Sequence, residues 1–365
     1  MTLIFNSYAG APEFTEPAAW LHRIEGYTGI LESMAPRHQV IGIERINYEG
    51  QCEQNGVQYH FIKQKKKIVR FPLRIHGLIK KLKPDVVFIN GFIFPLQLLQ
   101  LRLTVGRKTK IIVINRSEKP GRGIKKYLQK LADKCVNAYL FTSLEFGHQW
   151  VQKGIISRRD KIHEVFHGSS VFKPGDKEEA RALLTVSGSP VYLWVGRLDA
   201  NKDPLTAIKA FSQFLEQQPS ATLYMIYHTE ELEAEIRKLI EEDELAQKRI
   251  RLVGKVPHQQ LQMWYNAADF FISASHYEGG GISVCEAMSC GCVPIITDID
   301  SFRILTGQGK CGILYEPGSE QALLHALQAS LQFDLEKERD KTLDRFREHL
   351  SFEAIGKKIE VVISR

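Results

Sequence analysis

The chain has 365 residues, more than a single hydrophobic core of about 250–300 residues usually organises, so two domains are expected. A hydrophobic content of 44% and a charged content of 25% are ordinary for a soluble globular protein. The net charge of +7 conceals an asymmetry: residues 1–172 carry 27 Lys and Arg against 13 Asp and Glu (27 − 13 = +14), and the remainder carries 22 against 29 (22 − 29 = −7).

Several functional classes are disfavoured by composition alone. The first residues lack a positive segment and a long apolar core, so no signal peptide is predicted. The most membrane-like window, residues 86–105, is interrupted by polar residues and predicts a buried strand followed by a helix. Six cysteines without a Cys-x-x-Cys pair indicate a reduced compartment and no zinc site. The prediction is a cytoplasmic protein, in contact at most with the inner face of a membrane as a peripheral protein.

Strand and helix patterns alternate through the N-terminal half. Apolar runs predict strands, and amphipathic segments between them predict helices, which together indicate a parallel sheet in a Rossmann-like domain. No Gly-x-Gly-x-x-Gly follows the first strand, which disfavours a dinucleotide dehydrogenase. The predicted strands are 3–5, 40–43, 59–62, 86–89, 111–114, 139–141 and 163–166, and the predicted helices are 17–34, 71–82, 95–103, 124–133 and 145–153.

The basic excess of this half concentrates between residues 60 and 83, which contain nine cations and no acid. A solvated charged face explains such a run. Contact with anionic lipid also explains it, because each basic residue near such a surface contributes about 1 kcal/mol. Nucleic acid is a weaker alternative, since no stacking aromatics are interleaved with the cations. No nucleic-acid partner is therefore predicted.

A motif in the C-terminal half joins a strand to a helix. The buried run 191–196 ends at Gly196, and Asp203 followed by Pro204 has the N-cap and first-turn chemistry of a helix that runs to residue 215. Lys202 then lies beside a helix N-terminus, where the macrodipole disfavours a cation by a few tenths to about 1 kcal/mol. An anionic ligand between Lys202 and the helix N-terminus would make the interaction favourable. Lys202 and the nearby Arg197 are therefore candidate anion-binding residues.

The stretch from residue 270 to residue 297 organises the rest of the chain. Strands 223–227, 250–253, 270–273, 293–296 and 312–315 predict a second parallel sheet. The glycines at 279–281 permit positive φ and close approach to a ligand, and the following helix start favours an anion. Ser283 and Glu286 have the spacing of a capping box, which offers Glu286 a structural role. Glu278 has no such role and lies just past a strand end, where ligands bind in open α/β sheets.

This stretch resembles the signature of the retaining glycosyltransferases of family 4, also called glycosyltransferase group 1. The signature reads here as Glu278-Gly279, then Glu286-Ala287-Met288, then Gly291-Cys292-Val293-Pro294. Residues 196–204 resemble a second family element, Gly-Arg-Leu followed by Lys-Asp-Pro. The similarity is dense over 191–317 and thin before residue 163. It implies a GT-B fold, in which two Rossmann-like parallel-sheet domains face an interdomain cleft.

The resemblance implies a domain division and a role for each site residue. It gives an acceptor-binding domain over 1–172, a nucleotide-sugar-binding domain over 173–345, and a terminal helix within 346–365 that packs back on the first domain. In the family the first Glu lies by the donor sugar, the second Glu holds ribose, and the Arg and Lys hold the diphosphate. The predicted catalytic residues are Glu278, Arg197 and Lys202, and the predicted nucleotide-sugar-binding residues are Glu286, Gly280, Gly281, Ile282, Ser283, Val256 and Gly10.

One departure concerns the acceptor side. Many relatives carry a His near the end of the strand predicted at 86–89, where this chain reads Phe88-Ile89-Asn90-Gly91. No acidic or imidazole base is apparent at that place.

The predicted function is transfer of a hexose from a nucleoside diphosphate sugar to an acceptor hydroxyl with retention of configuration. Polysaccharide or lipid-linked glycan assembly is the expected context, with a nucleotide sugar and a glycan or lipid-linked acceptor as partners. No cofactor and no metal are expected, because two cations suffice to stabilise a leaving diphosphate. Two alternatives stay open: a sugar-nucleotide epimerase, and a non-catalytic scaffold subunit of a glycosyltransferase complex.

Overall fold

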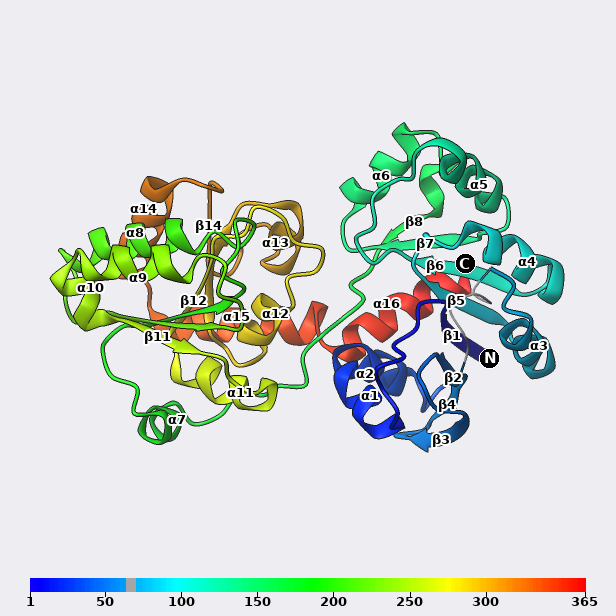
Figure 1. The fold of residues 1–365 in the computed structure, drawn as a ribbon, viewed down its shortest axis with the longest axis horizontal. Helices are drawn as coiled ribbons and strands as arrows, with labels where there is room; N and C mark the ends of the chain where they lie inside the picture. The colour runs from blue at the N-terminus through cyan, green and yellow to red at the C-terminus, as the bar shows by residue number, and fades with distance from the viewer. Residues whose placement is uncertain (64–69) are drawn as a thin grey trace. The chain divides into compact units, whose positions relative to one another are not determined.

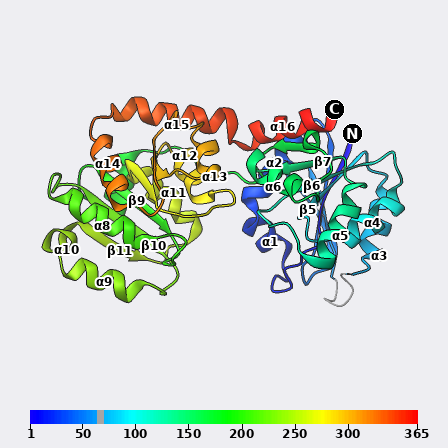
Figure 2. The same cartoon turned by 90° about the horizontal axis from the view of Figure 1, so that it is seen from above.

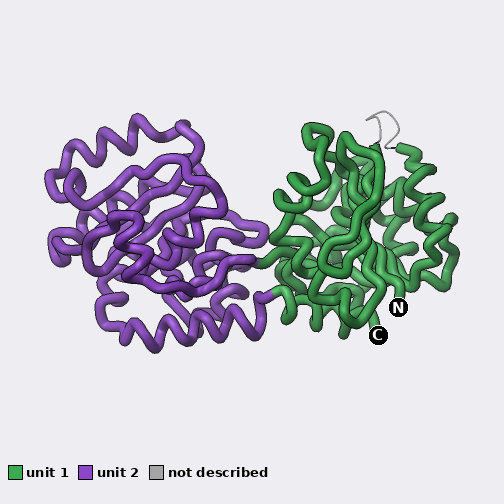
Figure 3. Tube along the Cα trace, turned by 90° about the horizontal axis from the view of Figure 1, so that it is seen from below, with its two compact units in different colours: residues 1–169, 352–365 green, residues 170–351 purple. Residues whose placement is uncertain are grey.

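The computed structural model describes residues 1–63 and 70–365, and it divides into two compact units (Figures 1 and 3). Unit 1 comprises Met1–Ser169 and Phe352–Arg365, and unit 2 comprises Ser170–Ser351. The sequence had placed these boundaries after residues 172 and 345. Within the described ranges, no helix combines the length and the apolar composition that crossing a membrane requires. Part of the basic stretch 63–83, namely residues 64–69, lies outside the described residues.

Unit 1 is built on an eight-stranded sheet in the order β3-β4-β2-β1-β5-β6-β7-β8, parallel except for the β3–β4 hairpin. The order reverses between β1 and β5, which are hydrogen-bonded neighbours. Its strands are β1 (Thr2–Ser7), β2 (Gln39–Glu44), β3 (Gly50–Gln54), β4 (Val57–Phe61), β5 (Val86–Asn90), β6 (Lys110–Ile114), β7 (Ala138–Phe141) and β8 (Ile162–Glu164). Its helices are α1 (Pro17–Arg23), α2 (Glu25–Met34), α3 (Leu73–Leu82), α4 (Pro95–Val105), α5 (Gly123–Asp133), α6 (Leu144–Gln152) and α16 (Phe352–Ser364).

The C-terminal helix α16 packs on α2 within unit 1 (Figure 2). A close approach is possible because Gly29 lacks a side chain: a Cβ there would lie 2.6 Å from the ring of Phe352. The Ser33 hydroxyl donates to the Phe352 carbonyl at 3.1 Å, and Arg37 pairs with Glu360 at 2.8 Å. The last residues of the chain thus complete the fold of the first unit.

Unit 2 is built on a six-stranded parallel sheet in the order β11-β10-β9-β12-β13-β14. Here the order reverses between β9 and β12. Its strands are β9 (Val191–Gly196), β10 (Thr222–Tyr227), β11 (Ile250–Gly254), β12 (Phe270–Ser273), β13 (Val293–Thr297) and β14 (Ile313–Tyr315). Its helices are α7 (Lys177–Leu184), α8 (Pro204–Leu215), α9 (Glu233–Glu241), α10 (Glu244–Arg249), α11 (His258–Ala267), α12 (Ile282–Ser289), α13 (Asp300–Leu305), α14 (Glu320–Ser330) and α15 (Leu335–His349).

The predicted fold class, two α/β units on parallel sheets, is confirmed. Two local features differ from the sequence-based expectation. The segment predicted as one helix over 17–34 breaks at Ile24, whose φ of −109° and ψ of 19° separate α1 from α2. Strand β3 was not predicted, because its residues are half-buried or exposed and give no apolar signal.

Candidate active site

The two sequence motifs of unit 2 meet at the carboxyl ends of adjacent strands. Strand β9 leads into the loop that carries Arg197 and Lys202, and β12 leads into the loop that carries Glu278. These strands are hydrogen-bonded neighbours, with Ile272 opposite Trp194. They flank the point where strand order reverses, which is the place where open α/β sheets bind ligands.

Hydrogen bonds tie the two loops to one another. The backbone N–H of His276 donates to the carbonyl of Asn201 at 2.8 Å, and the Asn201 side chain donates to the carbonyl of Tyr277 at 3.0 Å. His276 Nε2 also lies 3.1 Å from Oδ2 of Asp203, which caps α8 in a left-handed conformation with φ of 45°. These hydrogen bonds therefore fix the two loops, and the catalytic candidates that they carry, relative to one another.

Lys202 and Glu278 form an ion pair between the loops, and both side chains are mostly buried. A second ion pair joins Arg197 Nη2 to Asp199 Oδ2 at 2.9 Å. Asp199 also accepts from the backbone N–H of Lys202 at 2.9 Å through its other oxygen. Asp199 thus contacts the guanidinium of Arg197 and the backbone of Lys202, and the two loops bring two cations and two carboxylates, Asp199 and Glu278, to the switch point.

The predicted anion-binding turn begins α12. Gly281 is the N-cap residue with φ of 58°, and no side chain of the described residues caps the helix. Gly280 and Ser283 are half-buried, and Ile282 is 44% exposed, so this end of the helix is accessible. Of the three glycines expected to permit positive φ, only Gly281 adopts it. A Cβ at Gly281 would lie 2.7 Å from the ring of Phe302, so close packing as well as φ requires glycine there.

The capping-box interpretation of Ser283 and Glu286 is wrong. The helix is capped by Gly281, and the carboxylate of Glu286 is bonded elsewhere. It accepts from His258 Nε2 at 2.7 Å and from the Tyr265 hydroxyl at 3.0 Å. Glu286 is 6% exposed, and burial beside this carboxylate raises the pKa of Tyr265 well above its usual range. Tertiary contacts from α11 therefore replace the local cap.

The remaining predicted residues lie in the two units separately. Val256 is half-buried in the turn between β11 and α11, and His258, two residues later, connects this turn to Glu286. Gly10 belongs to unit 1 and follows β1. A Cβ at Gly10 would approach the Arg45 carbonyl at 3.3 Å, and the next residue donates its N–H to that carbonyl.

Three supporting residues were missed from the sequence: Asp199, His258 and Tyr265. Asp199 stands inside the Gly-Arg-Leu-Asp motif, so its position two residues after Arg197 was a usable signal. His258 and Tyr265 gave no comparable signal, because Tyr265 matches an ordinary apolar helix face and His258 an ordinary first helical position. Both are recognised only through their bonds to Glu286.

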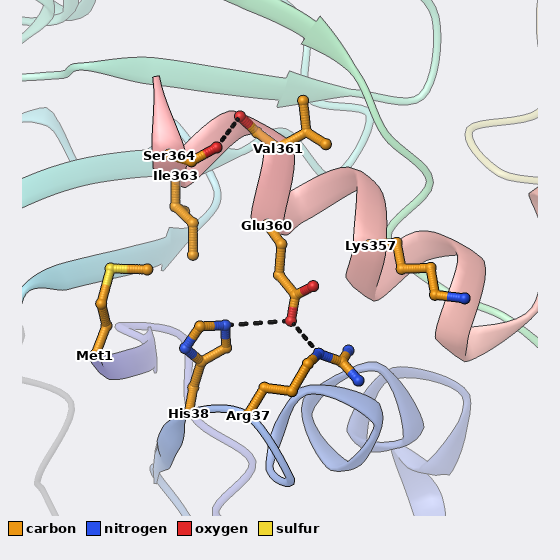
Figure 4. Close-up of a pocket in the computed structure, with 8 residues that line it drawn as sticks. All are labelled: Met1, Arg37, His38, Lys357, Glu360, Val361, Ile363 and Ser364. Carbon is orange, nitrogen blue, oxygen red and sulfur yellow. Dashed lines mark hydrogen bonds and ion pairs between the residues drawn. The ribbon is translucent and has the colours of Figure 1, made fainter.

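A pocket of about 520 Å³ lies in unit 1, and none of the candidate residues lines it (Figure 4). It is lined by α16 and by the turn between α2 and β2, and Glu360 projects into it toward Arg37 and His38. Met1 also lines it, which sets the pocket at the amino ends of β1 and β2, opposite the edge where parallel sheets bind ligands. Among the described residues, no group of three or more His, Cys, Asp and Glu side chains is placed to hold a metal ion.

Comparison with known proteins gives one family match and several similar chains. Residues 176–348 match the family described as glycosyl transferases group 1. A GDP-mannose:cellobiosyl-diphosphopolyprenol alpha-mannosyltransferase of Xanthomonas campestris is 26% identical over 334 residues, which cover 88% of this chain and 78% of that protein. Other curated relatives align over a smaller part of their own length, for example 40% of a D-inositol 3-phosphate glycosyltransferase of Catenulispora acidiphila.

Solved structures show the same architecture over the whole chain. A glycosyltransferase of Rickettsia africae superposes with a TM-score of 0.76 at 18% identity, over 100% of this chain and 98% of that one. The Anabaena protein HepE, solved in complex with UDP, superposes with a TM-score of 0.74 at 15% identity over 100% of both chains. Residues 176–348 are therefore similar to the glycosyl transferases group 1 family, and the chain has the GT-B fold of the solved glycosyltransferases.

Proposed function

We propose that this glycosyltransferase moves a hexose from a nucleoside diphosphate sugar to an acceptor hydroxyl with retention of anomeric configuration, in lipid-linked glycan or polysaccharide assembly. The main support is the meeting of Arg197, Lys202 and Glu278 at the strand-order reversal of unit 2. Two cations and the free N-terminus of α12 fit a diphosphate, and the carboxylate of Glu278 fits the hydroxyl groups of a sugar.

The chemistry requires only groups of this chain and of the substrates. The bond between the anomeric carbon and the diphosphate oxygen breaks, and a bond to the acceptor oxygen forms on the same face. The acceptor proton passes to the departing diphosphate. Arg197 and Lys202 stabilise the charge that develops on that group, and such electrostatic stabilisation usually contributes most to the rate enhancement. In this proposal no metal ion or cofactor is needed.

Binding of the donor reorganises the ion pair between Lys202 and Glu278. A diphosphate carries more negative charge than one carboxylate and competes for Lys202. The released carboxylate of Glu278 then accepts hydroxyl groups of the donor sugar. Glu286 holds the ribose through the remaining lone pairs of its oxygens, in line with its burial and its fixed orientation by His258 and Tyr265.

The relatives supply the first donors and acceptor to examine. The Xanthomonas protein is named for GDP-mannose and a cellobiosyl-diphosphopolyprenol, and HepE was solved with UDP. GDP-mannose is therefore the first donor candidate and UDP-sugars are the second. The proposed acceptor is a glycan on a diphosphate-linked lipid.

Donor binding is tested by thermal unfolding with UDP, GDP, ADP, CMP and their sugar conjugates. A nucleotide at a hundredfold excess over its dissociation constant adds about 2.7 kcal/mol, which raises Tm by several degrees at roughly 2–4 °C per kcal/mol. We expect the nucleotides of one base to raise the Tm of the wild-type protein by this amount. In Arg197→Ala the same nucleotides should not raise Tm. Arg347→Ala removes an exposed arginine of α15 and should leave the shift unchanged. No shift with any nucleotide would contradict the proposal and favour the scaffold alternative; conversion of the donor without acceptor would favour the epimerase.

We further propose peripheral contact with an anionic membrane through α5. Ile124, Tyr127 and Leu131 recur at i, i+3 and i+7 on one face of this helix and are 80%, 74% and 48% exposed. Exposed cations flank them: Arg122, Lys125, Lys126 and Lys130. An apolar stripe bordered by cations is the pattern of helices that lie in the interface of anionic lipid.

Co-sedimentation with vesicles distinguishes α5 from the basic stretch predicted at 63–83. We expect binding to phosphatidylglycerol-containing vesicles and little binding to pure phosphatidylcholine. The pair Ile124→Ser and Tyr127→Ser should lower the bound fraction at least fivefold. Lys80→Glu with Lys81→Glu tests the predicted stretch, and Lys238→Glu with Lys248→Glu in unit 2 makes an equal charge change elsewhere. Equal binding by all four proteins would refute contact through α5.

A further inference from the structure

The segment that enters unit 2 from unit 1 is fastened to α11. Residues 170–175, here called the connecting segment, begin unit 2 and lead toward α7. The Lys173 N–H donates to Gln262 Oε1 at 3.2 Å, and the Gly175 N–H donates to Asn266 Oδ1 at 2.8 Å. Asn266 Nδ2 in turn donates to the Lys173 carbonyl at 3.2 Å. These hydrogen bonds with side chains of α11 fix the backbone of the connecting segment against that helix.

A local turn at the start of the connecting segment directs the side chain of Phe172. The Phe172 N–H donates to Ser170 Oγ at 3.0 Å, a backbone-to-side-chain bond that closes a turn. Ser170 Oγ also lies 2.9 Å from Ser289 Oγ of α12, and both serines are buried. Ser289 Oγ lies 2.7 Å from the carbonyl oxygen of Glu286, one turn earlier in the same helix. The turn that directs Phe172 is therefore attached to the helix that carries Glu286.

The ring of Phe172 lies against the two side chains that bind the Glu286 carboxylate. Phe172 is 6% exposed, and its ring centre is 5.0 Å from that of His258 and 6.0 Å from that of Tyr265. His258 Nε2 donates to Oε1 of Glu286 at 2.7 Å, and the Tyr265 hydroxyl donates to Oε2 at 3.0 Å, since a carboxylate only accepts hydrogen bonds. Phe172 therefore contacts the partners of both carboxylate oxygens.

His258 and Tyr265 differ in what holds them in place. Tyr265 is fully buried and also packs on Phe271, with ring centres 5.8 Å apart, so the surrounding core fixes its ring. His258 is the first residue of α11, and its side chain is 48% exposed. The ring torsion of a histidine is broad, so a buried ring beside it restricts its orientation. Loss of the Phe172 ring is therefore expected to loosen the orientation of His258 while Tyr265 keeps its place.

We propose that Phe172 is a positioning residue of the donor site. Its ring keeps the His258 imidazole in the orientation in which Nε2 donates to Glu286, and this bond keeps the carboxylate oriented toward the ribose hydroxyl groups of the nucleotide. The terminal torsion of a glutamate is broad without such contacts, so an oriented carboxylate binds hydroxyl groups at a smaller entropic cost. The inference rests on the proposed function, in which Glu286 binds the ribose, and it adds a residue that acts through another side chain.

The preference for ribose over deoxyribose tests this assignment. The probes are GDP and UDP, each compared by calorimetric titration with dGDP or dUDP, which lack one ribose hydroxyl group. The wild type should prefer the ribonucleotide of the base that it binds by about 10- to 100-fold, the effect of one hydrogen bond to a charged group. In Phe172→Leu this preference should fall at least about threefold, because leucine fills apolar space without presenting a flat ring to His258.

A double-mutant cycle shows whether Phe172 acts through His258. His258→Ala removes the imidazole and should itself lower the ribose preference at least about threefold. In that background, Phe172→Leu should change the preference by less than about twofold, because the side chain that Phe172 positions is gone. The matched control is Phe214→Leu, the same substitution at a fully buried phenylalanine of α8 that packs on Phe211, and it should keep the wild-type ribose preference.

The positioning role is overturned if Phe172→Leu keeps the wild-type ribose preference, or if its effect persists in full without the imidazole of His258. It is also overturned if Phe214→Leu lowers the preference equally, because loosened packing alone would then explain the change. His258 is half-exposed, so His258→Ala should fold even where Phe172→Leu does not, and an unchanged preference in His258→Ala alone refutes the role. Binding of GDP or UDP in these cases leaves the proposed donor binding standing. No binding of either nucleotide by the wild type overturns the proposed donor binding and the role of Phe172 with it.

Discussion

Replacement of Glu278 by alanine is expected to lower the turnover number for sugar transfer by about 10²- to 10³-fold, the range for losing one oriented polar group of an active site. Affinity for the nucleoside diphosphate should be kept or slightly increased. The reason is the ion pair with Lys202: without Glu278, this mostly buried cation has no carboxylate competing with the diphosphate. Separate measurements of the turnover number and of nucleotide affinity check the two parts of this expectation.

The matched control for Glu278→Ala is Glu316→Ala. Glu316 is exposed and follows β14, two strands away from β12 in the same sheet, so its removal changes the charge of unit 2 equally without touching Lys202. Turnover within about twofold of the wild type is expected, because exposed positions contribute little. Loss of nucleotide affinity in Glu278→Ala, or equal turnover in the two variants, would contradict the role of Glu278 at the donor sugar.

Glu286→Ala is expected to weaken nucleotide binding by about 10- to 100-fold, since a hydrogen bond to a charged group contributes roughly 1.5–3 kcal/mol. It should also lower the free energy of unfolding by about 1–3 kcal/mol, because the buried hydroxyl of Tyr265 loses its acceptor. Calorimetric titration with the nucleotide and chemical denaturation measure the two effects.

Tyr265→Phe distinguishes the binding role of Glu286 from its structural role. This variant removes one hydrogen bond to the Glu286 carboxylate and leaves the carboxylate in place beside His258. It should lose stability while nucleotide affinity falls by less than about threefold, a change below 1 kcal/mol. If Tyr265→Phe lowered nucleotide affinity as much as Glu286→Ala does, Glu286 would contribute only by maintaining the shape of the site.

Strand positions and sheet type were predictable from the sequence because buried parallel strands consist of nearly continuous apolar runs. The predicted strand 270–273 coincides with β12, and 111–114 overlaps β6. Strand β3 lacked this signal because it is an edge strand whose residues are half-buried or exposed. Its only signal was the turn that follows it, where Asn55 and Gly56 have φ of 49° and 79°.

The candidate donor site was predictable as a set of residues but not as an arrangement. Arg197, Lys202 and Glu278 stand in recognisable motifs, yet no local sequence pattern shows which of these side chains are in contact. Pairing of β9 with β12 decides that Lys202 meets Glu278. The same limitation produced the wrong capping box: the spacing of Ser283 and Glu286 is a local signal, and a histidine from α11 overrode it.

The amino-acid sequence alone determined the two α/β units, the resemblance to a glycosyltransferase family and the loops that carry the donor-site candidates, because apolar periodicity and motif residues are local properties of the chain. Only the tertiary structure decided the partners of Glu278 and Glu286 and the burial of Glu44. Those contacts join side chains such as Lys202 and Glu278, which are 76 positions apart in the sequence and meet because β9 pairs with β12. Burial raises the pKa of Glu44 to about 7, and burial is a property of the whole fold.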